Sequence, residues 1–131
     1  MSLSRKEAEI QHEVRLALGT QSGCVWWRNN VGQAEFVSPQ GKVSRVRYGL
    51  SEGSSDLIGL IAMPITQAMV GQVIGRFCAL ELKAPGATTA KDRAEKQEMF
   101  RNLVNRMGGY AELLNDPQQA LPALNRARRI G

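Results

Sequence analysis

Two short apolar runs carry charged residues in places where buried strands normally have none. The runs cover 53–60 (GSSDLIGL) and 78–83 (CALELK). Both are rich in Leu and Ile and are bounded by Gly, Ser or Pro, which is typical of short buried strands. Asp56 opens the first run, and Glu81 and Lys83 interrupt the second. If the two strands are neighbours, three charged groups converge at one end of a sheet, an arrangement that suits a divalent cation with a lysine beside it.

The spacing within the second run fixes which side chains share a face. Side chains alternate along a strand, so Glu81 and Lys83 point to one side. Leu80 and Leu82 point to the other side. A Glu-x-Lys pair alone is more simply explained by an edge strand with solvated charges, because both residues are common. The apolar residues before the pair and the abrupt Ala-Pro-Gly after it favour the buried strand.

The first periodic segment predicts an amphipathic helix over 4–18, with Ser4 as N-cap and Gly19 as its stop. At about 100° per residue its apolar stripe consists of Ile10, Val14, Ala17 and Leu18. Glu7 falls inside this stripe. A carboxylate on a buried face needs a metal or a basic partner. Alternatively, Glu7 is a charge at the helix end that reaches water or interacts with the helix N-terminus.

The middle of the chain predicts a strand over 24–30, followed by a hairpin of 35–37 and 43–48 with Pro and Gly in its loop. Arg45 and Arg47 share one face of the returning arm. They could contact a phosphate backbone. They could equally form an exposed face that keeps the hairpin soluble.

Two connecting segments flank the first charged run. The Gly/Ser-rich segment 49–55 leads to Asp56, and its small residues suit a loop at the mouth of a site. The segment 62–75 has no clear period, and we expect a loop there that leads into the strand bearing Glu81. We do not expect a domain boundary in it.

A long helix is predicted to start at 87–89 and to end at Met107, before Gly108-Gly109. Its apolar stripe comprises Phe100, Leu103, Val104 and Met107. One to two turns upstream, the same side carries Arg93, Lys96 and Gln97. This change fits a helix whose first half leaves the core and overhangs a site, or a helix end that protrudes into solvent.

The chain then predicts a last strand over 110–114 and a final helix that begins at Asp116-Pro117. The resulting order of helices and strands indicates an α/β fold with a mixed central sheet flanked by helices on both faces. At 131 residues the chain is long enough for one core, so we expect a single domain over 1–131.

The net charge of +5 is clumped along the chain. The clusters are Arg5 and Lys6, Arg45 and Arg47, Lys91, Arg93 and Lys96, and Arg126, Arg128 and Arg129. This balance suggests nucleic acid as a partner, or a solvated basic face without a partner.

Other composition signals are weaker. Cys24 and Cys78 match no metal-ligand spacing, so we expect buried, reduced thiols. His12 has no companion ligand nearby and receives no role. There is no apolar run long enough for a membrane span and no signal-peptide pattern, so we expect a cytoplasmic protein.

Taken together, these motifs resemble a stand-alone VRR-NUC domain, the virus-type replication-repair nuclease branch of the PD-(D/E)xK superfamily. The matching segments occur in family order and span nearly the whole chain: 7–11, 28–32, 53–59, 81–86, Gln97 and 108–110. Ser55 stands where the superfamily name implies Pro. The segment 62–75 is longer than the simplest family members need.

The resemblance implies a restriction-endonuclease-like fold and a site for Mg²⁺ or Mn²⁺. It assigns the metal ligands as Asp56, Glu81, the Leu82 backbone carbonyl and Glu7. Such hard cations prefer carboxylate and carbonyl oxygen. Lys83 would be the catalytic lysine, which orients a water or takes its proton, and Gln97 would support the lysine or a water.

The implied function is metal-dependent endonucleolytic cleavage of branched or duplex DNA. Small stand-alone members are similar to archaeal-type Holliday junction resolvases, which must nick two strands symmetrically, so we expect a homodimer. Our candidate DNA contacts are Arg28, Asn29, Arg45, Arg47, Lys91, Arg93 and Lys96. The alternatives are a flap or general nicking nuclease and a non-catalytic DNA-binding module. The joint presence of Asp56, Glu81 and Lys83 argues against the last alternative.

Overall fold

The structure is a computed structural model that describes residues 5–130. The chain divides into two compact units, Met1–Ile61 and Ala62–Gly131. The helices are α1 (Arg5–Gly19), α2 (Lys91–Arg106) and α3 (Ala120–Ala127); the strands are β1 (Cys24–Arg28), β2 (Gly32–Val37), β3 (Val43–Tyr48), β4 (Leu57–Ile61), β5 (Cys78–Leu82) and β6 (Tyr110–Leu114). Two single turns of 3₁₀ helix are η1 (Gln67–Met69) and η2 (Pro117–Gln119).

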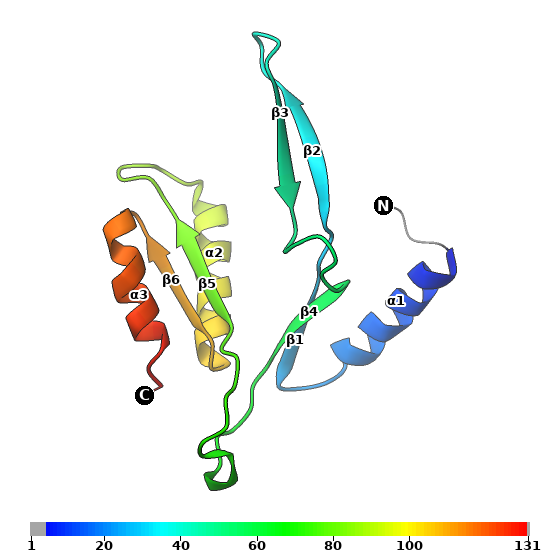
Figure 1. The fold of residues 1–131 in the computed structure, drawn as a ribbon, viewed down its shortest axis with the longest axis vertical. Coiled ribbons are helices and arrows are strands. Elements are labelled where there is room, and N and C mark those ends of the chain that lie inside the picture. The colour runs from blue at the N-terminus through cyan, green and yellow to red at the C-terminus, as the bar shows by residue number, and fades with distance from the viewer. Residues whose placement is uncertain (1–4, 131) are drawn as a thin grey trace. The chain divides into compact units, whose positions relative to one another are not determined.

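The first unit is built from α1, the antiparallel pair β1–β4 and the β2–β3 hairpin (Figure 1). β1 and β4 pair so that Trp26 lies opposite Gly59. A methyl group on Gly59 would overlap the Trp26 ring, so the indole occupies the space that a side chain would need. The pairing therefore requires glycine at this position of β4.

The hairpin forms where the sequence predicts it: β3 has the predicted bounds, and β2 begins three residues earlier than expected. Its loop closes through the Gly41 N–H, which donates to the Ser38 carbonyl at 2.8 Å, and Gly41 has a φ of 81°. Glycine adopts this left-handed backbone without steric cost. In the register Arg45 lies opposite Glu35, and Arg47 lies opposite Gln33, so both arginines share one face as predicted.

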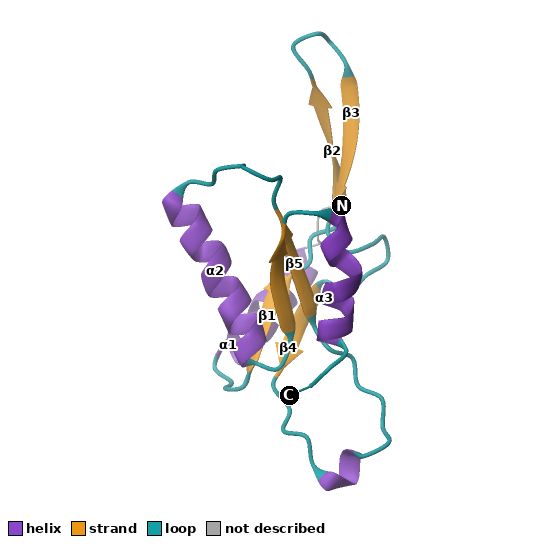
Figure 2. Ribbon diagram, turned by 90° about the vertical axis from the view of Figure 1, so that its left-hand side faces the viewer, coloured by secondary structure: helices purple, strands orange, loops and turns teal. Residues whose placement is uncertain are grey.

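The second unit is a β5–α2–β6 crossover followed by α3. β5 and β6 run parallel, and α2 and α3 pack on opposite sides of this two-stranded sheet (Figure 2). The core of the unit is small: Val104 is fully buried, and Ala111, Leu114 and Ala123 are nearly so. Parallel strands need a connection long enough to return the chain, and α2 supplies it.

The sequence correctly places the end of α2. Gly108 has a φ of 91°, its N–H donates to the Asn105 carbonyl at 3.2 Å, and the Gly109 N–H donates to the Val104 carbonyl at 2.9 Å. These two bonds form a Schellman motif, which satisfies carbonyls that the helix leaves open. The motif also turns the chain directly into β6.

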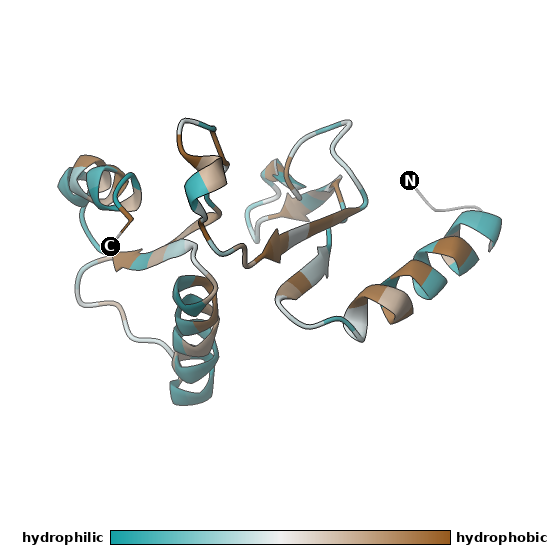
Figure 3. Cartoon of the chain, turned by 90° about the horizontal axis from the view of Figure 1, so that it is seen from below, coloured by the Kyte–Doolittle hydropathy of each residue, from teal (hydrophilic) through white to brown (hydrophobic). Residues whose placement is uncertain are grey.

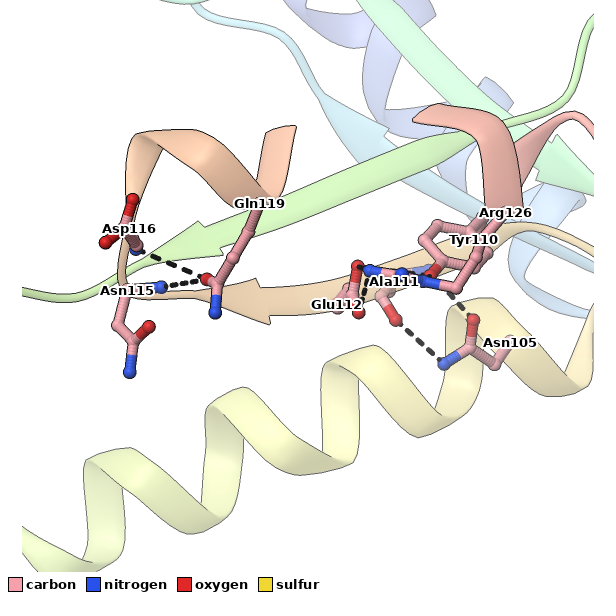
Figure 4. A network of polar contacts seen from close by, with 8 residues as sticks. All are labelled: Asn105, Tyr110, Ala111, Glu112, Asn115, Asp116, Gln119 and Arg126. Carbon is pink, nitrogen blue, oxygen red and sulfur yellow. Dashed lines mark hydrogen bonds and ion pairs between the residues drawn. The ribbon is translucent and has the colours of Figure 1, made fainter. Parts of the chain in front are cut away.

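Polar contacts attach α3 to β6 (Figure 4). Arg126 donates from Nη2 to both carboxylate oxygens of Glu112, at 2.6 and 2.8 Å, and from Nε to the Tyr110 hydroxyl at 3.0 Å. The hydrogen bonds to Glu112 and then to Tyr110 raise the pKa of the Arg126 guanidinium above its usual value. The predicted cap at Asp116-Pro117 is present, as a capping box between Asp116 and Gln119.

A second arginine holds the C-terminal end of α3. Arg76 lies just before β5 and donates hydrogen bonds to the carbonyls of Gly108, Gly109, Ala127 and Arg129, at 2.6 to 3.2 Å. Its guanidinium carbon also lies 5.7 Å from the centre of the Tyr110 ring. One side chain thus connects the start of β5, the start of β6 and the end of α3.

Several expectations are wrong in detail. The predicted stripe of α1 is largely exposed rather than buried: Ile10 is 52% exposed and Val14 is 40% exposed. Figure 3 shows the hydrophobic positions along α1 in brown. The physical reason is that α1 packs on β1 near its C-terminal end, where Leu18 is half-buried. Ser4, the predicted N-cap, lies outside the described residues. Both cysteines are free thiols, but Cys78 is exposed and Cys24 is half-buried.

The predicted sheet also differs from the observed one. Among the described residues the strands form three two-stranded sheets, and no single central sheet is present. For the same reason β5 is not a fully buried strand, and Leu80 and Leu82 are exposed. The α/β character and the loop over 62–75 are confirmed. No helix in the described part of the chain is long and apolar enough to cross a membrane.

Candidate active site

The Glu-x-Lys motif lies at the C-terminal end of β5. Ala79 and Glu81 are half-buried while Cys78, Leu80 and Leu82 are exposed, so the predicted alternation of faces is confirmed. Lys83 follows the strand directly, and its Nζ lies 3.8 Å from Oε1 of Glu81. The Lys83 side chain is 21% exposed and that of Glu81 is 33% exposed. Both charged groups are therefore close together and still reachable from solvent.

Lys83 is held by two further contacts. Its Nζ donates to the Thr89 hydroxyl at 2.5 Å, and its backbone N–H donates to the Leu114 carbonyl at 2.9 Å. The sequence placed Thr89 at the start of a helix, but α2 begins at Lys91 with no side-chain cap. Thr89 thus lies before the helix, and its hydroxyl binds the lysine.

A pocket of about 300 Å³ lies between β5 and α2. Glu81 borders it from the strand, and Arg93, Lys96 and Gln97 border it from the helix. The structure therefore brings these four predicted site residues together within the second unit. Positions three and four apart share a helix face, which is why the three α2 residues meet the same pocket.

Asp56 lies at the entrance to β4 in the first unit. It is exposed, and its backbone carbonyl accepts a hydrogen bond of 2.8 Å from the Asn29 N–H. This bond extends the β1–β4 pairing by one step beyond Arg28 and Leu57. The backbone that carries the carboxylate is thereby attached to the end of β1.

The Asn29 side chain organises the loop before Asp56. Asn29 is 8% exposed; its Nδ2 donates to the Ser54 hydroxyl at 2.8 Å and the Ser55 carbonyl at 2.9 Å. Its Oδ1 accepts from the Leu50 N–H at 3.1 Å. These bonds make Asn29 a positioning residue for the loop over 50–55. The contact with DNA that the sequence suggested for Asn29 stays a prediction.

The other predicted residues are distributed between the two units. Glu7 on α1 is exposed and belongs to the first unit, as does Asp56, whereas Glu81 and Leu82 belong to the second. No cluster of three or more His, Cys, Asp or Glu side chains suited to a metal ion is found within residues 5–130. The four-oxygen metal site stays a prediction.

The remaining candidate DNA contacts are exposed side chains. They are Arg28, Arg45 and Arg47 in the first unit and Lys91, Arg93 and Lys96 in the second. Long cations in this state can reach phosphate groups at low desolvation cost, and their contact with DNA stays a prediction.

Sequence reasoning missed three residues of this region: Thr89, Ser54 and Arg101. Arg101 borders the same pocket as Gln97. Its spacing of eight from Arg93 and four from Gln97 was a readable signal, because these positions share one helix face. Ser54 bonds to Ser51 nearby but also to Asn29, 25 residues away, and Thr89 bonds to Lys83, six residues away. No local pattern marks the contacts with Asn29 and Lys83.

Comparison with family models, curated proteins and solved structures gives no match for this chain.

Proposed function

We propose that this chain is a metal-dependent endonuclease that hydrolyses phosphodiester bonds in DNA. The observation that supports it most is the Glu81–Lys83 pair, 3.8 Å apart at the end of β5. A basic helix face with Arg93, Lys96 and Gln97 lies across the adjacent pocket. A carboxylate for a cation, an ammonium for a water and cations for a phosphate are the groups that such hydrolysis uses.

The donor set fits Mg²⁺ or Mn²⁺. Asp56, Glu81, Glu7 and the Leu82 carbonyl supply only oxygen, which these hard cations prefer. When bound, the cation polarises the phosphate and makes a coordinated water more acidic. Lys83 orients the attacking water or takes its proton, and the Thr89 hydroxyl restricts the position of its Nζ. Gln97 supports the lysine or the water.

We propose one mixed sheet of the restriction-endonuclease type for this chain, as the resemblance implies. Two-stranded sheets rarely stand alone, and parallel strands are normally covered on both faces. Leu82 is 72% exposed and Ile61 is 55% exposed, which is unusual for apolar strand residues. Burying this apolar surface in a central sheet, with helices on both faces, would be favourable.

The leading substrate is a four-way DNA junction. A resolvase nicks two strands symmetrically, and a homodimer with two copies of the site meets that need. We propose this assembly on the resemblance to archaeal-type resolvases, and the proposal is separable from cleavage itself.

Single-turnover cleavage of synthetic junctions, flaps and duplexes in Mn²⁺ tests the proposal. We expect Asp56→Asn and Lys83→Ala to lower the rate by about a hundredfold or more, the range for loss of a metal ligand or a general base. DNA binding should persist in both. Glu52→Gln and Lys42→Ala, which remove exposed charges in the 50–55 loop and the hairpin loop, are matched controls.

Two outcomes would contradict the proposal at different levels. Unchanged cleavage in both Asp56→Asn and Lys83→Ala would contradict the assignment of these residues to the active site. Equal rates on junction, flap and duplex would leave the nuclease but remove the preference for junctions.

A further inference from the structure

The pocket between β5 and α2 carries more positive charge than its one carboxylate balances. Arg93, Lys96 and Arg101 border it from α2, and Glu81 borders it from β5. Glu81 already lies 3.8 Å from the Lys83 ammonium. Three cations therefore face a carboxylate that has a basic neighbour of its own. The electrostatic balance of the pocket favours an anion.

Arg101 supplies an independent observation. Its Nη1 atom is buried and has no hydrogen-bond partner among the described residues. A guanidinium N–H that is removed from water and left unpaired is costly, and such atoms are rare in folded proteins. Arg101 also borders the pocket, so its side chain carries an unused donor close to it. A change of side-chain rotamer that turns this nitrogen toward the pocket would let a bound acceptor satisfy it.

The chemistry of the donors selects the ligand. A guanidinium presents N–H groups in a planar fork that matches two oxygens of a phosphate. Arg93 and Lys96 are exposed and can add charge at the mouth, while Arg101 is half-buried and lies deeper. Phe100 also borders the pocket.

We propose that Arg101, together with Arg93 and Lys96, binds a backbone phosphate of the nucleic-acid strand in this pocket. This inference rests on the proposed function and adds a phosphate subsite beside Glu81 that the resemblance does not assign. Arg101 is a binding residue in it. The other basic residues of the chain remain candidates for contacts elsewhere on the strand.

The test is a binding measurement without cleavage, with Ca²⁺ in place of Mg²⁺ or Mn²⁺. Single phosphates of a synthetic four-way junction are replaced, one position at a time, by uncharged methylphosphonates. For the unsubstituted chain we expect one position, or two adjacent ones, to weaken binding about tenfold, the loss typical of a charge-assisted hydrogen bond. For Arg101→Met we expect a similar loss on unmodified DNA and no further loss at that position, because the two changes remove the same contact.

Arg106→Met is the matched control, since Arg106 is an exposed arginine on the same helix that does not border the pocket. It should keep the positional sensitivity of the unsubstituted chain. Thermal unfolding monitored by circular dichroism checks that the variants fold. If Arg101→Met fails to fold, Arg101→Lys serves instead: it keeps the charge but loses the planar fork, so sensitivity at that position should be reduced.

The outcomes separate this inference from the proposed function. If Arg101→Met retains the full positional sensitivity, or if the chain binds no DNA, the inference is overturned. If Arg101→Met and the methylphosphonate remove the same contact but no cleavage occurs with Mn²⁺, the phosphate-binding role of the pocket is supported and the nuclease proposal fails. A titration with inorganic phosphate, followed by NMR at the Arg101 side chain, tests whether the pocket binds free phosphate. A shift there with no positional sensitivity on DNA would assign the pocket to free phosphate and overturn the strand contact.

Discussion

Asn29 and Asp56 are joined by a backbone hydrogen bond of 2.8 Å, at the point where β1 ends and β4 begins. The same asparagine fixes the intervening loop through its side chain, which bonds to Leu50, Ser54 and Ser55. The position of the Asp56 backbone thus depends on a residue 27 positions earlier in the chain. The metal-ligand role that we propose for Asp56 would depend on this kind of support.

Asn29→Ala tests that support. Removing the amide takes away the partners of the Leu50 N–H and the Ser55 carbonyl, and leaves the Ser54 hydroxyl with only its bonds to Ser51. We therefore expect a loss of about 1–3 kcal/mol in the free energy of unfolding. Cleavage should fall at least roughly tenfold, because small misplacements of catalytic groups are costly. Urea denaturation and single-turnover cleavage measure the two effects. Asn30→Ala, which truncates an exposed neighbour, is the control. Equal behaviour of the two variants would contradict the role of Asn29.

Thr89→Val removes the hydroxyl that accepts a hydrogen bond from the Lys83 Nζ. Valine keeps the branched shape, so the fold should change little. We expect cleavage to fall about five- to tenfold, which corresponds to one hydrogen bond of about 1 kcal/mol. The adjacent Thr88→Val changes an exposed threonine in the same way and should leave the rate unaltered. A rate for Thr89→Val within twofold of the control would show that the hydroxyl does not position the lysine.

Gly59→Ala places a methyl group where the Trp26 ring lies. Overpacking of this kind costs about 1–3 kcal/mol, and we expect that loss in the free energy of unfolding. Gly19→Ala provides the comparison, because no atom lies within 4 Å of the added methyl and its backbone is not left-handed. Chemical denaturation with tryptophan fluorescence follows both variants. Unchanged stability of Gly59→Ala would mean that Trp26 does not occupy the space above β4.

Arg76→Met removes all four hydrogen bonds that connect β5, β6 and the end of α3. Bonds from a charged donor contribute about 1.5–3 kcal/mol each, but the bonds to the Gly108 and Arg129 carbonyls are exposed, so water can replace them. We therefore expect a net loss of about 2–3 kcal/mol in the stability of the second unit. Arg128→Met, which removes an exposed arginine beside the same helix end, is the control. Differential scanning calorimetry compares the two variants. Identical melting profiles would contradict the role of Arg76 in connecting these elements.

Local patterns in the sequence correctly predicted most elements. The alternation in CALEL predicted which side of β5 carries Glu81, and Gly108-Gly109 predicted the end of α2. The loop chemistry of 38–41 predicted the hairpin. In each case the determining interaction lies within a few residues, so it can be read from spacing alone.

Interactions between distant residues explain what the sequence did not show. The helical periodicity of α1 predicted a buried apolar stripe. Burial also depends on which element covers the helix, and Ile10 remains exposed. In the sequence, Asn29 looks like a polar surface residue. Its role in the loop depends on partners that lie 21 to 26 positions away. The unpaired nitrogen of Arg101 has no sequence signal at all, because an unsatisfied donor is defined only by its surroundings.

The four hydrogen bonds of Arg76 have a practical consequence for the preparation of this protein. Two of its four acceptors are carbonyls of Ala127 and Arg129, so the last few residues help to hold the start of the strand that bears Glu81. Trimming the chain before position 127 would remove two of the four hydrogen bonds that hold that arginine and would weaken the attachment of the strand at its beginning. An affinity tag with its cleavage site is therefore better placed at the other terminus, and a truncated sample that fails to cut DNA would say little about the nuclease residues themselves.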